Sequence, residues 1–212
     1  MPELSRELPR LYAIVDVGCF SVSRQTTSAV VNFACELAAG GVELIQYRNK
    51  DGDVRTMLSH ARELRRVLGR KVTLIMNDRA DLSLAADFDG VHVGQDDLSP
   101  EGARLVVGTQ RMVGVSTHTL GQVRQADASP VDYIAYGPIF STTAKRNPDP
   151  VVGLDGLRAA RAETKKPLVA IGGITRANVA SVREAGADCV AVISDLVSSP
   201  RQAAEEVLRR MV

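Results

Sequence analysis

The sequence contains no tryptophan, and aromatic residues make up only 4% of its 212 positions. Its 26 basic and 25 acidic residues almost cancel, which leaves a formal charge of +1. A nucleic-acid-binding surface needs a clustered basic excess and often stacking aromatics. We therefore expect no nucleic-acid partner. Any basic cluster in such a chain is local and more typical of a site for a small anionic ligand.

Long apolar runs and paired cysteines are missing too. No segment approaches the roughly 18 uninterrupted apolar residues of a membrane helix, so we expect no membrane partner. The first ten residues mix charge and proline and lack the apolar core of a signal peptide. Cys19, Cys35 and Cys189 are widely spaced and form no C-x-x-C motif, which argues against a zinc site and a disulfide framework. These absences predict a cytoplasmic protein with reduced thiols.

What the sequence does contain is a regular alternation of strand-like and helix-like segments. Helical patterns end in glycine, the usual signal just past a helix C-terminus, at Thr27–Ala39, Asp53–Leu68 and Arg176–Ala185. Apolar, β-branched runs predict eight strands: Leu11–Asp16, Val42–Arg48, Val72–Asp78, Gly90–Gly94, Met112–Thr117, Tyr133–Phe140, Pro167–Gly173 and Cys189–Leu196.

Strands that alternate with helices form a parallel sheet with right-handed crossovers. Eight of them predict an α/β protein whose sheet closes into a (β/α)8 TIM barrel. A chain of 212 residues suits one such domain, residues 1–212, with residues 1–10 as an N-terminal extension. The segments Asp81–Ala86 and Gly102–Val107 are short for helices and are the weakest part of this prediction.

Polar clusters directly follow three of the predicted strands. Arg48 and Lys50 lie two apart, on the same side as Gln46, and Asp78 and Asp97 end the next two strands. The carboxyl ends of the strands carry the chemistry in TIM barrels. Mg²⁺ takes one or two carboxylates and completes its shell with water and substrate phosphate. These clusters therefore predict a site for Mg²⁺ and a polyphosphate.

Simpler interpretations of the same residues remain open. Asp78, together with Asp81, would serve equally well as a cap of the following helix. Arg48 and Lys50 would be an ordinary solvated pair if the strand end did not carry a ligand.

The last two predicted strands point to a second anion site. Gly172 and Gly173 follow the seventh strand, and Ser194 closes the eighth. Loops at these positions of a TIM barrel commonly bind phosphate, because glycine lets the backbone N–H groups approach the anion. A simple turn is the alternative for the two glycines. The irregular segment Ser141–Pro150 contains two prolines and is typical of a binding loop.

The three histidines give weaker signals. His92 alternates with apolar residues within a strand, and we expect it to be hydrogen-bonded in the core. His118 follows a strand end and is a candidate for contact with substrate. His60 lies in a helical segment and is expected on the surface. No Ser/His/Asp or Cys/His arrangement can be read from the sequence.

Taken in order, seven motifs resemble the thiamine-phosphate synthase family. They are Q-Y-R-N-K, N-D-R, G-V-H-V-G-Q-D-D, G-V-S-T-H-T, G-P-I-F-S-T, A-I-G-G-I-T and V-I-S, and the resemblance covers about Leu11 to Val197. It implies a TIM-barrel transferase that joins hydroxymethylpyrimidine diphosphate to thiazole or carboxythiazole phosphate. The products would be thiamine monophosphate and diphosphate, formed through a dissociative, carbocation-like step that depends on Mg²⁺.

The resemblance also implies residue roles. Asp78 and Asp97 would hold Mg²⁺, and Arg48, Lys50, Lys145 and Ser116 would act on the reacting diphosphate and pyrimidine. The implied substrate-binding residues are Gln46, Arg48, Lys50, Asn77, Ser116, Thr142, Thr143, Ala144, Lys145, Gly173, Ile193 and Ser194. The chain departs from the family at Thr142-Thr143-Ala144-Lys145, where Ala144 replaces an expected hydroxyl residue.

Three rival functions are weighed against this one. A thiazole tautomerase of the same fold would transfer protons without a diphosphate substrate, and His118 is its candidate residue. A non-catalytic phosphate-binding barrel would be expected to have lost a metal ligand, and a sugar-phosphate isomerase or epimerase would need a differently placed acid–base pair. The sequence does not decide the oligomeric state, and a homo-oligomer is compatible with it.

Overall fold

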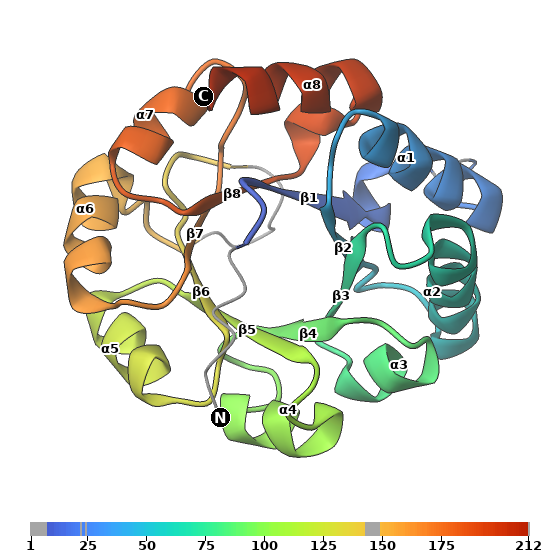
Figure 1. Ribbon diagram of the computed structural model, residues 1–212, viewed down its shortest axis with the longest axis horizontal. Helices are drawn as coiled ribbons and strands as arrows, with labels where there is room; N and C mark the ends of the chain where they lie inside the picture. Colours follow the sequence, from blue (N-terminus) through green and yellow to red (C-terminus); the bar gives the residue numbers. More distant parts are fainter. Residues whose placement is uncertain (1–7, 22, 24, 143–148, 212) are drawn as a thin grey trace.

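The strands of this protein form a closed, wholly parallel barrel in the order β1 to β8, and the helices surround it (Figure 1). The computed structural model describes residues 8–21, 23, 25–142 and 149–211. The predicted α/β class and TIM-barrel architecture are therefore confirmed. The strands are β1 (Leu11–Asp16), β2 (Leu44–Arg48), β3 (Thr73–Asn77), β4 (Gly90–Val93), β5 (Met112–Thr117), β6 (Tyr133–Tyr136), β7 (Leu168–Ile171) and β8 (Cys189–Val192).

A helix follows each strand and packs outside it. The helices are α1 (Thr27–Ala39), α2 (Val54–Leu68), α3 (Ala80–Ala85), α4 (Pro100–Val107), α5 (Leu120–Ala128), α6 (Gly153–Glu163), α7 (Val179–Glu184) and α8 (Pro200–Arg210), with short 3-10 turns η1 (Val17–Cys19) and η3 (Ser194–Leu196). Local sequence sets several of their ends. Asp53 caps α2 by accepting from the N–H groups of Arg55 and Thr56, and Gly69 ends it with φ of 60°.

Some predicted boundaries are wrong: several strands were predicted too long, and the segment predicted at Gly102–Val107 is too short, because α4 begins at Pro100. The sixth strand ends at Tyr136, because Gly137 and Pro138 follow and proline has no N–H for a strand ladder. The eighth ends at Val192 and passes into η3. The seventh ends at Ile171, and its helix begins at Val179 rather than at Arg176. The two short segments that were in doubt are both helical, as α3 and α4.

Apolar side chains fill two separate layers. Tyr12, Leu44, Ile75, Tyr133 and Val169 belong to a cluster inside the barrel. A larger cluster lies between the barrel and the helices. Because a buried parallel strand must be apolar on both faces, the strands read as continuous apolar runs in the sequence. None of the helices in the described part of the chain is long and apolar enough to cross a membrane.

A repeated carboxylate–guanidinium contact ties the amino-terminal ends of the strands together. The contact occurs three times, each time with an aspartate that directly precedes β4, β6 or β8. Its carboxylate accepts a backbone N–H of the preceding odd-numbered strand. It also pairs with an arginine of the helix that leads into this odd-numbered strand. The three sets are Asp89 with Leu74 and Arg65, Asp132 with Val113 and Arg104, and Asp188 with Leu168 and Arg161.

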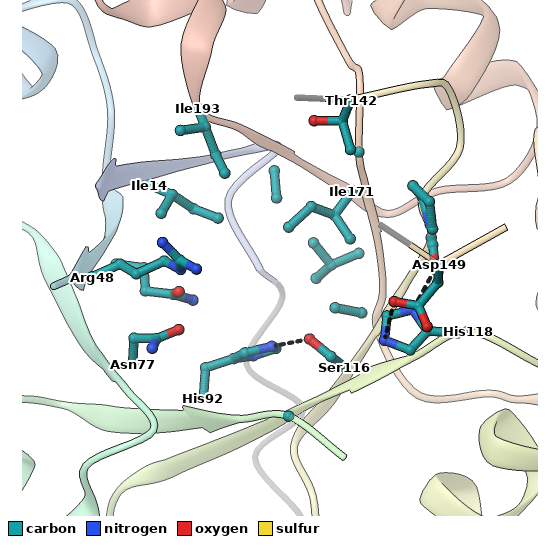
Figure 2. A pocket seen from close by; sticks show the side chains of 18 of the residues that line it. Ile14, Arg48, Asn77, His92, Ser116, His118, Thr142, Asp149, Ile171 and Ile193 are labelled. Atoms are coloured by element: carbon teal, nitrogen blue, oxygen red, sulfur yellow. Dashed lines mark hydrogen bonds and ion pairs between the residues drawn. The ribbon is translucent and has the colours of Figure 1, made fainter. Parts of the chain in front are cut away.

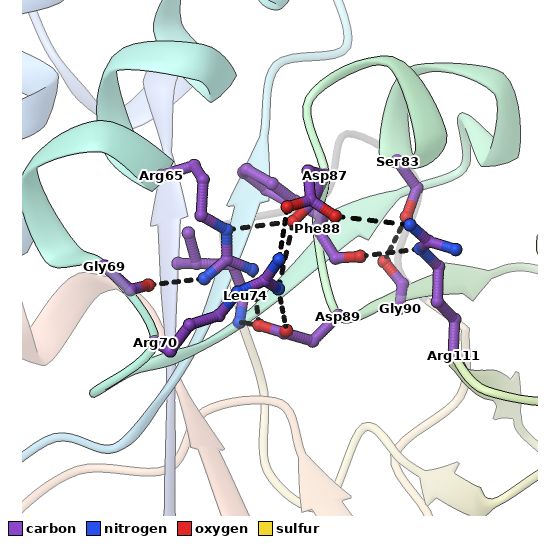
Figure 3. A network of polar contacts seen from close by, with 10 residues as sticks. All are labelled: Arg65, Gly69, Arg70, Leu74, Ser83, Asp87, Phe88, Asp89, Gly90 and Arg111. Carbon is purple, nitrogen blue, oxygen red and sulfur yellow. Dashed lines mark hydrogen bonds and ion pairs between the residues drawn. The ribbon is translucent and has the colours of Figure 1, made fainter.

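The first of these sets extends into a larger network (Figure 3). Arg70 contacts both Asp87 and Asp89, and Arg111 pairs with Asp87 from the far side. Arg65 also donates to the carbonyl oxygens of Gly69 and Asp87. These contacts satisfy backbone groups at the end of the barrel that is associated with stability rather than chemistry.

Candidate active site

A cavity of about 410 Å³ opens at the carboxyl ends of the strands. Figure 2 shows Arg48 and Asn77 on one side of it and His118 with Asp149 on the opposite side. The cavity brings together the eleven predicted site residues that belong to the described part of the chain: Gln46, Arg48, Lys50, Asn77, Asp78, Asp97, Ser116, Thr142, Gly173, Ile193 and Ser194. The predicted residues Thr143, Ala144 and Lys145 lie outside the described residues.

The cations of β2 and its loop are held by carboxylates. Nη1 of Arg48 lies 2.5 Å from Oδ2 of Asp16, a side chain only 3% exposed at the end of the neighbouring strand β1. Nζ of Lys50 lies 3.1 Å from Oδ2 of Asp78. Arg48 is therefore not an ordinary solvated side chain, whereas Lys50 is 50% exposed and remains in contact with solvent. Both cations line the cavity, positioned by partners on either side of β2.

Asp78 and Asp97 face one another from the loops after β3 and β4. Burial raises the pKa of the Asp78 carboxyl, and the side chain of Asp97 raises it further, while Lys50 opposes the shift. Asp78 has φ of 60°, a backbone conformation that few residues other than glycine adopt. Oδ2 of Asp97 accepts the N–H of Gly94 at 2.9 Å.

Asp78 does not cap α3, so that alternative is wrong. The N-cap position belongs to Arg79, and no side chain caps it. Two repelling carboxylates and a strained backbone instead fit a site for a hard divalent cation. Among the described residues no cluster of three or more His, Cys, Asp or Glu side chains fits a metal. A Mg²⁺ ion held by Asp78 and Asp97 would thus need water or substrate oxygens to complete its shell.

His92 lies in the floor of the cavity and bonds through both ring nitrogens. Nδ1 is 3.0 Å from the Tyr133 hydroxyl, and Nε2 is 2.8 Å from Oγ of Ser116, a contact drawn in Figure 2. The expected core hydrogen bond is confirmed. Because the ring is buried, the pKa of His92 falls to about 4, and the imidazole is neutral at pH 7.

The surface position expected for His60 is wrong. Its side chain is 1% exposed and lies against Tyr47, whose hydroxyl is 2.9 Å from Nδ1. A helix of a barrel buries one stripe of residues, and His60 falls in the stripe of α2 that also contains Met57, Ala61 and Leu64. The residue type suggested exposure, whereas its spacing from these apolar residues would have predicted burial.

The loops after β7 and β8 line another part of the cavity. Gly172 and Gly173 have φ of 99° and 64°, so the backbone requires glycine. A Cβ at Gly172 would meet Cα of Pro138 at 2.5 Å, and one at Gly173 would meet the carbonyl oxygen of Ser141 at the same distance. Arg176 joins the two loops, because its backbone N–H and its Nε both donate to Oδ2 of Asp195.

Sequence reasoning missed several residues of this site. Tyr12 and Ile14 of β1 line the cavity, although the first strand carries no polar cluster at its end to signal this. Asp16 was not predicted as a site residue, because its contact with Arg48 joins two different strands and leaves no local pattern in the sequence. His118 was a candidate, and its partners come from the fold: Nδ1 donates to the carbonyl of Gly137 at 2.6 Å, and Nε2 lies 3.4 Å from Oδ2 of Asp149.

Comparison with known proteins identifies the family. A model of the thiamine monophosphate synthase family matches residues 11–196. The chain belongs to this family. It is 64% identical to thiamine-phosphate synthase of Koribacter versatilis over 96% of both chains. It is 45% identical to thiamine-phosphate synthase of Chloroflexus aurantiacus, over 96% of this chain and 92% of that one.

Solved structures agree with this assignment. A thiamine phosphate pyrophosphorylase from Pyrococcus furiosus superimposes with a TM-score of 0.85 and 32% identity, over 99% of this chain and 98% of that one. Enzymes with these names are transferases of thiamine biosynthesis, so the expected enzyme class and the suspected family are both confirmed.

Proposed function

We propose that this protein is a thiamine-phosphate synthase that joins 4-amino-2-methyl-5-hydroxymethylpyrimidine diphosphate to thiazole or carboxythiazole phosphate. The proposal rests on one observation. A single cavity combines cations and facing carboxylates with loops in which only glycine fits. A synthase of two phosphorylated substrates needs both kinds of anion site. The high identity to proteins of that name over nearly the whole chain supports the same conclusion.

The diphosphate is assigned to the β2–β4 side of the cavity. Arg48 offers a planar fork of donors and Lys50 a point charge, and both suit phosphate oxygens. Asn77 lies beside them and lines the same cavity. Asp78 and Asp97 fit Mg²⁺, which would neutralise charge on the diphosphate when bound. Lys145, which lies outside the described residues, is assigned to the same group by the family resemblance.

The proposed reaction needs charge stabilisation rather than a strong base. The bond between the pyrimidinylmethyl carbon and the diphosphate oxygen breaks, and its electron pair leaves with the diphosphate. The lone pair of the thiazole nitrogen then forms the new C–N bond. With thiazole phosphate no proton has to move, whereas carboxythiazole phosphate would also lose CO2 and take up a proton. Arg48 and Lys50 stabilise the charge that develops on the departing diphosphate. The cavity holds the second substrate close to the cationic carbon.

The thiazole phosphate is assigned to the loops after β6, β7 and β8. Gly173, Ile193, Ser194 and Thr142 line the cavity there. The apolar side chains of Ile171 and Ile193 project into the cavity in Figure 2 and offer a surface for a ring. Backbone N–H groups beside glycine can approach a phosphate closely, because no Cβ intervenes. Thr143 and Ala144 are assigned to the same phosphate only by the family resemblance.

The decisive experiment is incubation of the purified chain with both substrates and Mg²⁺. The proposal expects equal amounts of diphosphate and thiamine monophosphate. A thiazole tautomerase acting through His118 would instead isomerise a thiazole phosphate without any pyrimidine substrate. Release of no diphosphate under conditions in which both substrates bind would exclude the synthase assignment.

A further inference from the structure

The backbone ladder between β7 and β8 stops short of the two loops that follow these strands. Its last paired residues are Ile171 and Ala191. Gly172 and Gly173 of the β7 loop and Ser194 of the β8 loop lie beyond the ladder, and all three line the cavity. The ladder therefore does not set the spacing between the two loops.

One arginine joins the loops where the ladder has ended. The backbone N–H of Arg176 donates to Oδ2 of Asp195 at 2.8 Å, and Nε of Arg176 donates to the same oxygen at 3.0 Å. Nη2 lies 3.3 Å from Oδ1 of Asp195, and Nη1 lies 3.1 Å from Oε2 of Glu206 in α8. Both the backbone and the side chain of the β7 loop thus hold one carboxylate of the β8 loop.

Each loop is also braced within itself. In the β7 loop, the side-chain amide of Asn178 donates to the carbonyl oxygen of Gly173 at 3.0 Å and accepts the N–H of Thr175 at 2.8 Å. In the β8 loop, Ser194 and Asp195 belong to the same 3-10 turn, η3. The contact between the loops therefore joins two units that each keep their own shape.

Arg176 and Asp195 lie behind the wall of the cavity. Neither side chain lines it, whereas Ser194, the residue directly before Asp195, does. A carboxylate beside an anion site repels the anion unless a cation neutralises it. Arg176 supplies that cation, and the two side chains are only 30% and 17% exposed. The pair thus removes an unfavourable charge and fixes the loops at the same time.

We propose that Arg176 and Asp195 are positioning residues that fix the spacing between the loops after β7 and β8, and through it the affinity for the phosphate of the thiazole substrate. The inference rests on the proposed function, which assigns that phosphate to these loops. Donors on two loops bind one anion well only when the distance between the loops matches it. A changed spacing should weaken thiazole phosphate and leave the pyrimidine diphosphate, assigned to the β2–β4 side, unaffected.

Asp195→Ala removes the contact between the loops, and Asp188→Ala is its matched control. Asp188 also accepts a backbone N–H, at 2.8 Å, and pairs with an arginine, at 2.5 Å, but it lies at the amino-terminal ends of β7 and β8. The measurements are denaturant unfolding and the dissociation constants of thiazole phosphate and of the pyrimidine diphosphate. Each substrate is titrated separately against each variant and the wild-type protein.

Both alanine variants should lose stability, and only Asp195→Ala should lose affinity for thiazole phosphate. The expected loss is about tenfold, the effect of one hydrogen bond to the phosphate that is no longer aligned. Asp195→Asn keeps an oxygen that can accept the Arg176 N–H, so it should recover most of the loss. In turnover, Asp195→Ala should raise the KM of thiazole phosphate and leave the KM of the pyrimidine diphosphate unchanged.

The inference is overturned if Asp195→Ala keeps the wild-type affinity for thiazole phosphate, if it weakens both substrates equally, or if Asp195→Asn recovers nothing. The same selective loss in Asp188→Ala would also overturn it. Should Asp195→Ala not fold, Arg176→Ala decides by the same two titrations. A wild-type protein that binds both substrates and forms no thiamine phosphate would defeat the proposed function alone, because the affinities are measured without turnover.

Discussion

Arg48 and Asp16 form an ion pair across neighbouring strands, with Nη1 and Oδ2 2.5 Å apart, and the carboxylate is only 3% exposed. Asp16 also accepts the N–H of Gly18 at 3.0 Å. The pair places the guanidinium at the cavity and keeps a buried carboxylate satisfied. The proposed function and the stability of the fold would therefore depend on the same contact.

Arg48→Ala should lower turnover by about 10²–10³, because it removes a charge contact to the departing group. It should also destabilise the fold by about 3–5 kcal/mol, since the Asp16 carboxylate would lose its partner. Adding Asp16→Asn should restore much of that stability and none of the activity. Denaturant unfolding and steady-state kinetics on the wild type, Arg48→Ala and the double variant test this, and a double variant less stable than Arg48→Ala would contradict it.

Asp97→Asn should weaken the response to Mg²⁺. The expected results are a higher Mg²⁺ concentration for half-maximal turnover and a smaller rise in melting temperature on Mg²⁺ addition, because one of two carboxylate ligands is lost. Asp81→Asn is the control, since Asp81 pairs with Arg79 outside the cavity. An unchanged Mg²⁺ response in Asp97→Asn would remove this residue from the metal site.

Asp78→Asn should make the metal-free protein more stable at pH 7. Burial and the nearby Asp97 raise the pKa of Asp78 in the folded protein. The folded state therefore binds this proton more tightly, and the resulting stabilisation is lost as pH rises through the folded pKa. The advantage of the variant should shrink as the pH falls toward the unfolded pKa of about 3.9. Urea unfolding from pH 7 to pH 4 measures it, and an advantage that grows in acid would refute the assignment.

Asp89→Ala should lower the free energy of unfolding by about 1–3 kcal/mol, because the Leu74 N–H and Arg65 lose their carboxylate partner. The activity per folded molecule should stay unchanged, because Asp89 lies at the opposite end of the barrel from the cavity. Asp155→Ala removes a carboxylate that is 99% exposed and paired with the half-exposed Arg158, so it should change stability by no more than about 0.5 kcal/mol. Thermal or denaturant unfolding compares the two. Equal losses would mean that the contact with β3 contributes little.

Lys145→Ala should lower kcat by about 10²–10³ and change the KM of the thiazole phosphate little, if this residue stabilises the leaving diphosphate. Single-turnover measurements separate the chemical step from binding. A variant that changes only the KM of the thiazole phosphate would move Lys145 to the other substrate's site.

The sequence by itself determined the barrel and the positions of most site residues. Eight apolar runs predict eight buried parallel strands, and the polar residues after them gather because all carboxyl ends of a closed parallel sheet meet on one face. Gln46, Arg48, Asp78 and Asp97 could be found in this way because strand periodicity is a local property. The predicted ends of some strands are less accurate, such as the end of β6 before Gly137 and Pro138.

Only the tertiary structure decided which polar groups are partners. Asp16 meets Arg48, and Tyr12 meets Tyr133, across 32 and 121 residues of chain. No periodicity encodes such pairs, since they depend on the register and closure of the barrel. The burial of His60 and the contacts of His92 with Tyr133 and Ser116 have the same origin. Local patterns specify which segments form strands and which polar residues follow them, whereas the pairing of polar side chains is set by neighbours that only folding brings together.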